Sequence, residues 1–242
     1  MKAIETTGLT KKYGTKTAVD GIDFSVEEGE LFALLGVNGA GKTTTVRMLS
    51  CLSEPTAGEG FVQGHSVKSD KAAVKRIIGV SPQDTAVAEN LTVRENLVFM
   101  AKVYGFDKEK ENARVAEMIS LFGMDEVAGS RAKTLSGGWK RKLSIAMALI
   151  GEPEVLFLDE PTLGLDVLAR RELWKAVRGL KGRITVVLTT HYMEEAEELA
   201  DRIAIMINGK IAAEGDLAAI EKEAGVTGLE NAFVAIAERS MK

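Results

Sequence analysis

The sequence of 242 residues contains a single cysteine and no long apolar run. A lone cysteine, Cys51, cannot form an intramolecular disulfide and is typical of a reducing compartment. The longest clean apolar runs, such as 31–35 and 155–158, are far shorter than the ~18 residues that a membrane helix needs. The N-terminal residues also lack a hydrophobic signal core. We therefore expect a soluble cytosolic chain that reaches a membrane only through a partner.

The acidic side chains slightly outnumber the basic ones. There are 35 Asp and Glu residues against 31 Lys and Arg residues, for a net charge of −4. Phosphate-backbone binding needs a net basic face, so this balance argues against nucleic acid as the main partner. The short basic run 140–142 is instead expected to lie on a solvated helix face. With 45% apolar and 27% charged residues, the composition is that of a globular protein, and its length suits one large domain.

Strand and helix patterns follow one another along the chain. Apolar and polar residues alternate over 22–26, which predicts antiparallel strands in the first ~30 residues. The apolar runs 31–35 and 155–158 predict strands that are buried on both faces. The middle of the chain is predicted to be helical, and beyond it strands alternate with helices. This order predicts an α/β core with a mostly parallel sheet.

The first chemical motif is a phosphate-binding loop between an expected strand and an expected helix. It consists of Gly36, Val37, Asn38, Gly39, Ala40, Gly41, Lys42 and Thr43. Glycines let the backbone wrap closely around a phosphate, and consecutive N–H groups together with the helix dipole attract the anion. Lys42 is expected to reach the β- and γ-phosphates and Thr43 to bind Mg²⁺. The next residue, Thr44, is included in the predicted nucleotide site.

A second motif follows the apolar run 155–158, where the strand ends in Asp159 and Glu160. A carboxylate at the end of such a strand holds Mg²⁺ beside the phosphates in phosphate-loop proteins. We expect Asp159 to serve the metal and Glu160 to act as the general base for the attacking water.

A third motif, Leu135-Ser136-Gly137-Gly138, lies between the other two. The hydroxyl of Ser136, the glycine N–H groups and the start of a helix together offer a second phosphate-binding surface. With the phosphate loop and Asp159-Glu160, this segment resembles the ATP-binding subunits of ABC transporters, whose signature reads Leu-Ser-Gly-Gly-Gln. Trp139 stands where that family has the glutamine, so the polar contact of the glutamine is absent.

The resemblance covers nearly the whole chain and implies a fold. The implied fold is a P-loop NTPase (RecA-like) α/β core with an N-terminal antiparallel β-subdomain and an inserted α-helical subdomain. On this basis residues 1–242 form a single ATP-binding domain, with the helical subdomain at about 84–150 and a C-terminal tail at about 213–242.

The resemblance also implies roles for residues outside the three motifs. Tyr13 lies where the family stacks an aromatic ring on adenine. Gln83 matches the glutamine that contacts Mg²⁺ or water and senses the membrane partner. Asp166 takes the acidic position in the loop after the magnesium strand. His191 matches the histidine that contacts the γ-phosphate.

In this family two chains sandwich two ATP molecules head to tail, so the signature Ser136-Gly137-Gly138 of one chain completes the site of the other. The resemblance therefore implies ATP hydrolysis by a homodimer or pseudo-dimer that is bound to a membrane permease at the cytoplasmic face of the membrane. The segments 92–97 and 228–233 are similar to those of exporters of drugs, antibiotics, sodium or lipids. An importer subunit and a non-transport ABC ATPase remain alternatives. A plain phosphate-loop kinase or GTPase would not explain Leu135–Gly138 or His191.

Overall fold

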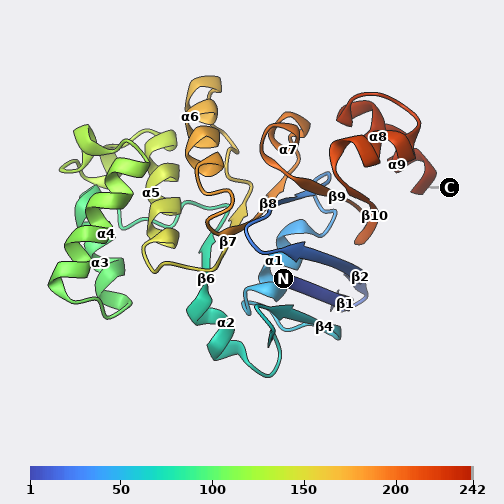
Figure 1. The fold of residues 1–242 in the computed structure, drawn as a ribbon, viewed down its shortest axis with the longest axis horizontal. Helices are drawn as coiled ribbons and strands as arrows, with labels where there is room; N and C mark the ends of the chain where they lie inside the picture. Colours follow the sequence, from blue (N-terminus) through green and yellow to red (C-terminus); the bar gives the residue numbers. More distant parts are fainter. Residues whose placement is uncertain (241–242) are drawn as a thin grey trace.

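Two β-sheets share a core in the computed structural model, which describes residues 1–240 (Figure 1). The larger sheet has six strands in the order β10-β9-β3-β8-β7-β6. Neighbouring strands from β9 to β6 are parallel, and β10 pairs antiparallel with β9. Its strands are β3 (Leu31–Leu35), β6 (Ile78–Ser81), β7 (Val155–Asp159), β8 (Thr185–Thr190), β9 (Arg202–Ile207) and β10 (Lys210–Gly215). The predicted α/β class with a mostly parallel sheet is confirmed.

The smaller sheet is antiparallel and has the order β2-β1-β4-β5. It contains β1 (Lys2–Tyr13), β2 (Lys16–Glu27), β4 (Ala57–Val62) and β5 (His65–Ser66). The strands expected in the first ~30 residues are therefore present, and Gly14 lies in the turn between them with a positive φ of 56°.

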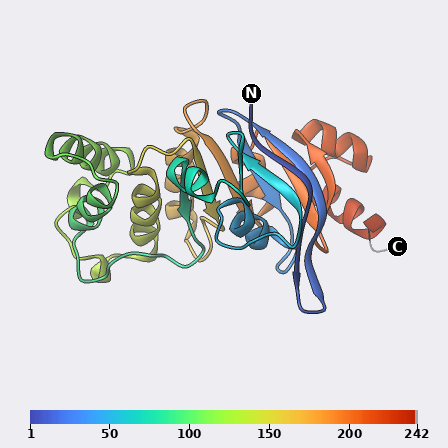
Figure 2. The ribbon, with the colours of Figure 1, turned by 90° about the horizontal axis from the view of Figure 1, so that it is seen from below.

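The helices lie on both faces of the large sheet and at one end of it (Figures 1 and 2). They are α1 (Lys42–Leu49), α2 (Lys71–Ile77), α3 (Val93–Val103), α4 (Lys108–Leu121), α5 (Gly137–Leu149), α6 (Val167–Arg178), α7 (Met193–Leu199), α8 (Leu217–Ala224) and α9 (Leu229–Ser240), with short 3-10 helices at Asp125–Val127 and Ala132–Thr134.

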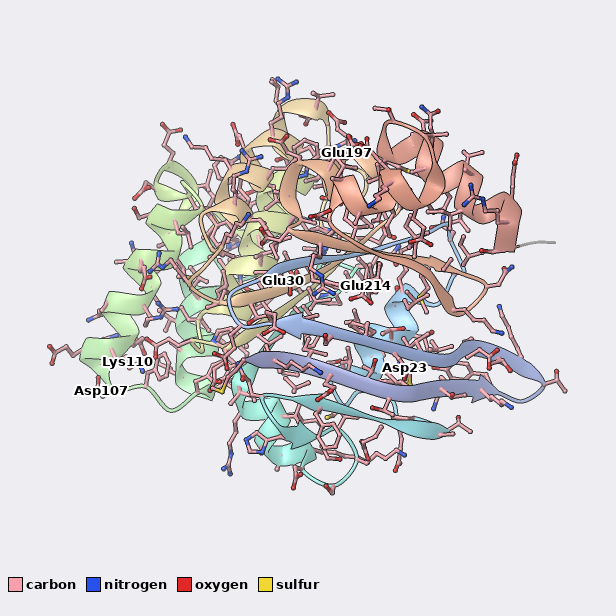
Figure 3. The ribbon with its side chains drawn as sticks, turned by 45° about the vertical axis from the view of Figure 1, so that its right-hand side comes forward. Asp23, Glu30, Asp107, Lys110, Glu197 and Glu214 are labelled. Carbon is pink, nitrogen blue, oxygen red and sulfur yellow. The ribbon has the colours of Figure 1, made fainter. Side chains whose placement is uncertain are left out.

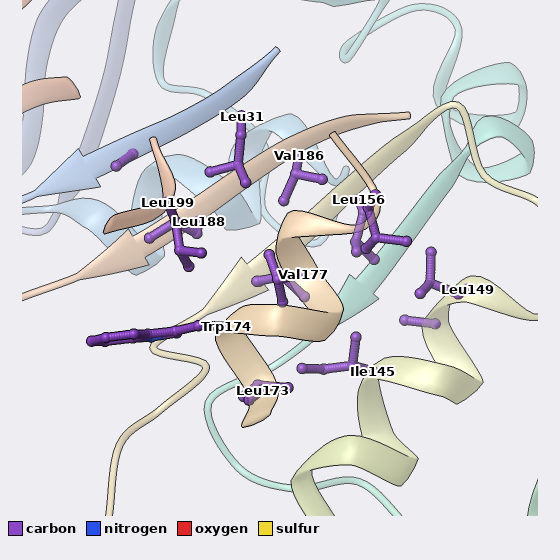
Figure 4. Close-up of a cluster of buried hydrophobic side chains, with 14 of the residues drawn as sticks. Leu31, Ile145, Leu149, Leu156, Leu173, Trp174, Val177, Val186, Leu188 and Leu199 are labelled. Atoms are coloured by element: carbon purple, nitrogen blue, oxygen red, sulfur yellow. The ribbon is translucent and has the colours of Figure 1, made fainter. Parts of the chain in front are cut away.

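The central strands are apolar on both sides because each face of the large sheet is covered. Along β3, Leu31, Ala33 and Leu35 join the core that is shared with α5, α6 and α7. Phe32 and Leu34 point to the other side, toward α1 and the small sheet, where the rings of Phe24 and Phe32 stack at 5.5 Å. Figure 4 shows the first of these cores between β7, β8 and the helices that cover them. Uninterrupted apolar runs are what such doubly covered parallel strands require.

In Figure 2 the green helices α3 and α4 lie farthest from the sheets, and the yellow-green α5 lies between them and the large sheet. A capping box begins α3, since Thr92 accepts a hydrogen bond from Glu95 N at 3.1 Å and Glu95 accepts one from Thr92 N at 2.8 Å. The start of the next helix, α4, is capped by Asp107. Helix α5 also packs against β6 and β7, so it joins this group to the large sheet.

One arginine ties the two sheets together. Arg202, at the start of β9, donates to Ser25 O of β2 at 3.1 Å and pairs with Glu30 at 3.2 Å. It also pairs with Glu214 of β10. Figure 3 labels Glu30 and Glu214 where the sheets approach each other. The guanidinium thus satisfies partly buried polar groups at the junction of the sheets.

The C-terminal part of the chain continues the core. The segment expected as a tail from about residue 213 starts inside β10, and α9 then contacts α7, β9 and β10. Within residues 1–240, no helix combines the length and the apolar character that crossing a bilayer requires.

Candidate nucleotide site

The phosphate-binding loop connects β3 to α1, as the sequence predicts. Gly36 N donates to Thr190 O at 3.2 Å, which ties the loop to the end of β8. A Cβ on Gly36 would lie 2.4 Å from Met206 O, so a side chain does not fit there. Gly41 has a φ of 113°, and a Cβ on it would lie 2.5 Å from Ala18 O. These two glycines are therefore required by backbone approach and conformation.

Lys42 is buried at the start of α1, with three partners for its ammonium group. Its Nζ donates to Gly36 O at 2.7 Å and to Val37 O at 3.3 Å. The same atom lies 3.1 Å from Glu160 Oε1, and both side chains are nearly inaccessible. Two loop carbonyls and the Glu160 carboxylate thus match the three donors of the lysine ammonium.

Asp159 ends β7 beside the loop. Its Oδ1 accepts hydrogen bonds from Thr43 at 3.0 Å and from Thr189 at 2.5 Å. Thr189 stands opposite Asp159 in the parallel register of β7 and β8. Of the three residues predicted to hold a metal, Thr43 and Asp159 therefore meet at one point, through a hydroxyl and a carboxylate.

Glu160 is held in a strained conformation. Its φ is 48°, a left-handed value that costs a non-glycine residue on the order of 1–3 kcal/mol. Its N–H donates to both Thr189 O and Thr189 Oγ1 at 3.1 Å. Its carboxylate lies between Lys42 and His191, whose Nδ1 is 2.6 Å from Glu160 Oε2. The backbone turn directs this carboxylate over the phosphate-binding loop.

These groups surround a cavity of about 460 Å³. Its wall includes most of the predicted site residues and three others, Lys16, Ala18 and Leu163. The full wall consists of Tyr13, Lys16, Ala18, Asn38, Gly39, Gly41, Lys42, Thr43, Thr44, Gln83, Glu160, Leu163 and His191. Tyr13, at the end of β1, is 50% exposed and is available to stack on a planar ligand. The remaining loop residues, Val37 and Ala40, belong to the same turn, in which Ala40 N donates to Val37 O.

The signature residues do not join this cavity. Ser136 caps α5, where its Oγ accepts a hydrogen bond from Trp139 N at 3.4 Å. Ser136 and Gly137 are exposed, and Gly138 faces α6, where an added Cβ would lie 3.0 Å from Ala169 Cβ. The indole of Trp139 is half-buried, with the ammonium of Lys142 4.4 Å from the ring. Trp139 therefore packs on its own helix and lines a groove with residues of α6.

The expectation of a solvated basic face at 140–142 is wrong for two of its three residues. Lys142 is buried and pairs with Glu172 of α6 at 2.6 Å. Arg141 is buried against main-chain carbonyls, and burial lowers its pKa to about 10. Nearby Asp159, Glu195 and Glu160 oppose this shift of the arginine pKa. The local charge run could not reveal that this side of α5 packs against β6 and β7.

A buried glutamate lies behind the histidine. Glu195, in the first turn of α7, is inaccessible and accepts a hydrogen bond from Trp174 Nε1 at 3.1 Å. Burial raises its pKa, while the side chains of Thr190, Trp174 and Thr162 oppose the change. Within residues 1–240, neither Glu195 Oε2 nor Thr162 Oγ1 has a hydrogen-bond partner. The Glu195 carboxyl group thus lies at the contact between α6, which carries Trp174, and α7.

Asp166, in the loop between β7 and α6, caps the start of α6. Its Oδ1 accepts hydrogen bonds from Leu168 N at 3.0 Å and from Ala169 N at 2.9 Å, so it is the N-cap of α6.

Sequence reasoning missed Thr189, Arg141 and Glu195. The pairing of β7 with β8 would have revealed Thr189, whereas the other two depend on which helix face is buried.

Comparison with known proteins identifies the family. A family model described as ABC transporter matches residues 19–163. The chain is 44% identical to the daunorubicin/doxorubicin resistance ATP-binding protein of Streptomyces peucetius over 225 residues, which cover 93% of this chain and 68% of the relative. The chain belongs to the ABC transporter family. This ABC subunit is also 42% identical to Nod factor export ATP-binding protein I of Burkholderia orbicola (strain AU 1054), over 94% of this chain and 75% of that protein.

Solved structures agree with this assignment for the ABC subunit. An ATP-binding subunit of an ABC transporter superposes with a TM-score of 0.87 at 30% identity, covering 97% of this chain and 99% of that one. A dimeric ATP-binding cassette in a post-hydrolysis state with ADP and Pi superposes with a TM-score of 0.79 at 25% identity, covering 88% and 98%. The predicted P-loop fold and the predicted ATP-hydrolysing ABC subunit are confirmed, and the named relatives agree with the exporter interpretation rather than with an importer.

Proposed function

We propose that this chain binds MgATP in the cavity beside residues 36–43 and uses its hydrolysis to drive export through a membrane permease. The observation that carries the proposal is the position of Glu160 between Lys42 and His191, at 3.1 Å and 2.6 Å, next to the phosphate-binding loop. Once phosphate takes the place of Glu160 on Lys42, a carboxylate that the imidazole still orients is suited to accept a proton from an attacking water.

The oxygen donors near the loop fit Mg²⁺. Thr43 Oγ1 and Asp159 Oδ1 meet at 3.0 Å, and Gln83 lines the same cavity. Within residues 1–240, no cluster of three or more His, Cys, Asp or Glu side chains forms a metal cage. Mg²⁺ usually takes one or two protein oxygens and completes its shell with phosphates and water, so Thr43, Asp159 and Gln83 are the residues that would hold it. When bound, it would neutralise charge on the transferring phosphoryl group.

Each side chain then has a defined task. Lys42 exchanges Glu160 for the β- and γ-phosphates, because its loop carbonyl contacts keep the ammonium in place. Glu160, once released, accepts a proton from the water that attacks the γ-phosphorus in line. His191 holds the carboxylate and contacts the γ-phosphate, while Tyr13 stacks on adenine. The arrangement works by positioning and by electrostatic stabilisation of the charged transition state.

The exposed signature residues support a head-to-tail pair of chains. Ser136 and Gly137 begin a helix and face away from the cavity of their own chain. A helix N-terminus with free N–H groups binds phosphate, so these groups are suited to the ATP that a second, identical or similar chain holds. Val37 and Leu163, which are exposed beside the cavity, would be covered by the same pairing.

Helix α3 is the surface we assign to the permease. It follows the Gln83 segment and exposes the apolar side chains of Phe99 and Val103 one turn apart. Exposed apolar patches of this kind mark sites of protein association. Docking there would hold the chain at the cytoplasmic face of the membrane and connect the permease to Gln83. The named export and resistance relatives support an exporter, but the cargo contacts would lie on the permease.

The hydrolysis mechanism is tested with Glu160→Gln. The amide keeps the size of the side chain but cannot accept the proton, so turnover should fall ~10²–10⁴-fold while ATP affinity is retained. Phosphate release measures turnover, and titration with a fluorescent ATP analogue measures affinity. Glu223→Gln, an exposed change on α8, is the matched control. Near-normal turnover of Glu160→Gln would remove Glu160 as the base.

The partner is tested by purifying tagged Glu160→Gln from native membranes with ATP and Mg²⁺. Mass spectrometry should find a polytopic membrane protein in stoichiometric amount. Adding Phe99→Asp should abolish this recovery, whereas Val234→Asp, which changes a comparably exposed apolar residue of α9, should not. Recovery of ribosomal or DNA-binding proteins without a membrane protein would favour a non-transport ABC ATPase instead.

A further inference from the structure

Arg141 connects two functional loops that are distant in sequence. Its Nη1 donates to Pro82 O at 2.5 Å and to Gln83 O at 3.3 Å. Its Nη2 donates to Asp159 O at 2.6 Å, and its Nε donates to Pro161 O at 2.9 Å. A single buried guanidinium thus contacts the main chain of both the Gln83 loop and the Glu160 loop.

The contacts fall on both sides of the strained glutamate. Asp159 O and Pro161 O belong to the residues immediately before and after Glu160. Because Glu160 has a φ of 48°, its backbone stays in this conformation only where neighbouring groups hold it. Thr189 fixes the N–H of Glu160, and Arg141 fixes the two flanking carbonyls. The direction of the Glu160 carboxylate therefore depends on Arg141.

The helix that carries Arg141 starts at the signature. Ser136 caps α5, and Arg141 lies within the second turn of the same helix. An α-helix is rigid over such a distance, so a displacement at its N-terminus reaches the guanidinium. In the proposed pair of chains, Ser136 touches the ATP of one site while Glu160 of the same chain serves the other. Arg141 is the side chain that lies between these two groups.

We propose that Arg141 is a positioning residue that orients Glu160 and makes this orientation depend on phosphate contact at Ser136, which couples the two ATP sites. This inference rests on the proposed function. A planar guanidinium with five donors suits four carbonyls in two loops, whereas a lysine offers one flexible point charge. The carbonyls are main-chain groups, so the contact does not depend on any particular side chain in either loop.

The test compares Arg141→Met, Arg141→Lys and the control Lys140→Met in the full chain. Lys140 is the preceding residue, and it pairs with Glu89 rather than with either loop. For each protein, kcat, the Hill coefficient for ATP and the affinity for a fluorescent ATP analogue are measured below its unfolding temperature. Arg141→Gln, which keeps amide donors, takes the place of Arg141→Met if the latter does not fold.

We expect Arg141→Met to lower kcat ~10–10²-fold, the loss typical of a misoriented catalytic group. Its Hill coefficient should fall from ~2, the limit for two sites, toward ~1. Nucleotide affinity should stay within about twofold, since a loss confined to kcat indicates lost orientation. Arg141→Lys should restore part of kcat, and Lys140→Met should match the parent. A merely structural role would lower the unfolding temperature without changing the Hill coefficient.

Two outcomes would overturn the inference: a kcat of Arg141→Met within about twofold of the parent, or a loss of kcat with an unchanged Hill coefficient. Glu160→Gln is measured in the same series so that the two proposals fail separately. If Glu160→Gln loses turnover while Arg141→Met keeps it, only the role of Arg141 is wrong. If Glu160→Gln keeps turnover, the assignment of the base is wrong and the inference about Arg141 falls with it.

Discussion

The two segments of this chain that the sequence predicts to bind phosphate differ in how much of a site each one forms. The loop at 36–43 is surrounded by groups of its own chain, including the buried contacts of Lys42 to Gly36 and to Glu160. The segment at 136–138 is a helix start that faces outward, and within residues 1–240 its one side-chain hydrogen bond is donated by Trp139 N to Ser136 Oγ. The first segment forms a cavity, whereas the second forms a surface that needs a partner.

Because of this difference, substitutions in the two segments should affect the free energy of unfolding differently. Buried ion pairs and hydrogen bonds around Glu160 depend on each other, so a change there disturbs both the fold and the chemistry. An exposed helix start can change its charge with little effect on the fold. Substitutions at 136–138 should therefore separate pairing of the chains from nucleotide binding, which substitutions near Lys42 cannot do.

Of the substitutions that probe this difference, Gly137→Glu should change turnover most. A Cβ added at Gly137 meets no atom within 4 Å, and the residue is exposed, so a side chain can extend from it into solvent in the single chain. An acidic residue in the first turn of α5 should leave the unfolding temperature unchanged or slightly higher. The new charge would repel the phosphates of a paired chain, and we expect turnover to fall ~10²-fold with unchanged affinity for a fluorescent ATP analogue.

The control for this variant is Gly137→Ala, which makes a similar backbone change without the charge. It should keep turnover close to that of the parent. Equal turnover of Gly137→Glu and the parent would mean that 136–138 is not a phosphate-binding surface, and the comparison of the two segments would fail.

A smaller change, in the pH dependence of stability, is expected at the buried Glu195 near the first segment. Burial raises the pKa of Glu195 from its ordinary value of 4.5, with Glu160 and Arg141 as charged neighbours. A carboxyl group with a higher pKa in the folded state binds its proton more tightly there. The stability that this proton contributes is therefore fully present below pH 4.5 and is lost as the pH rises through the raised pKa. Glu195→Gln removes this decline and still accepts the hydrogen bond of Trp174.

We expect Glu195→Gln to gain about 1–3 kcal/mol relative to the parent at pH 7, and to lose this gain as the pH falls toward 4.5. Urea unfolding across this pH range measures the difference. Glu223→Gln, at an exposed position, should show the same pH dependence as the parent. A constant difference between Glu195→Gln and the parent at every pH would contradict the raised pKa.

The smallest effect compares the caps of two neighbouring helices. Asp166 accepts two hydrogen bonds at the start of α6, at 3.0 Å and 2.9 Å, whereas Ser136 accepts one at 3.4 Å at the start of α5. Replacement of an N-cap by alanine costs ~1 kcal/mol. Asp166→Ala should therefore reduce the free energy of unfolding more than Ser136→Ala does. The reverse order in urea unfolding would mean that Ser136 contributes to the fold as well as to a surface.

Much of the core and the loop was predictable from the sequence because the relevant patterns are local. The apolar runs at 31–35 and 155–158 predicted strands that are covered on both faces, and the spacing of glycines with Lys42 predicted the loop between β3 and α1. The carboxylates after β7 were predictable for the same reason, since a strand ending in Asp159 and Glu160 needs only sequence order to be recognised.

The residues that hold Glu160 were not predictable in this way. Thr189 reaches Asp159 and Glu160 only because β7 and β8 pair in one register. Arg141 belongs to a basic run that predicted a solvated surface, and it is buried because one side of α5 packs against β6 and β7. Such contacts depend on where distant segments meet, and local charge patterns carry no information about that.

Residue type and short spacing were enough to predict the family, the α/β alternation and the groups that we expect to bind phosphate, because these features are local in the chain. Tertiary structure alone decided how Glu160 is aimed and which basic side chain is buried. Both results depend on the strained backbone of Glu160 and on a guanidinium that two loops share. These contacts form only once β6, β7, β8 and α5 have packed together.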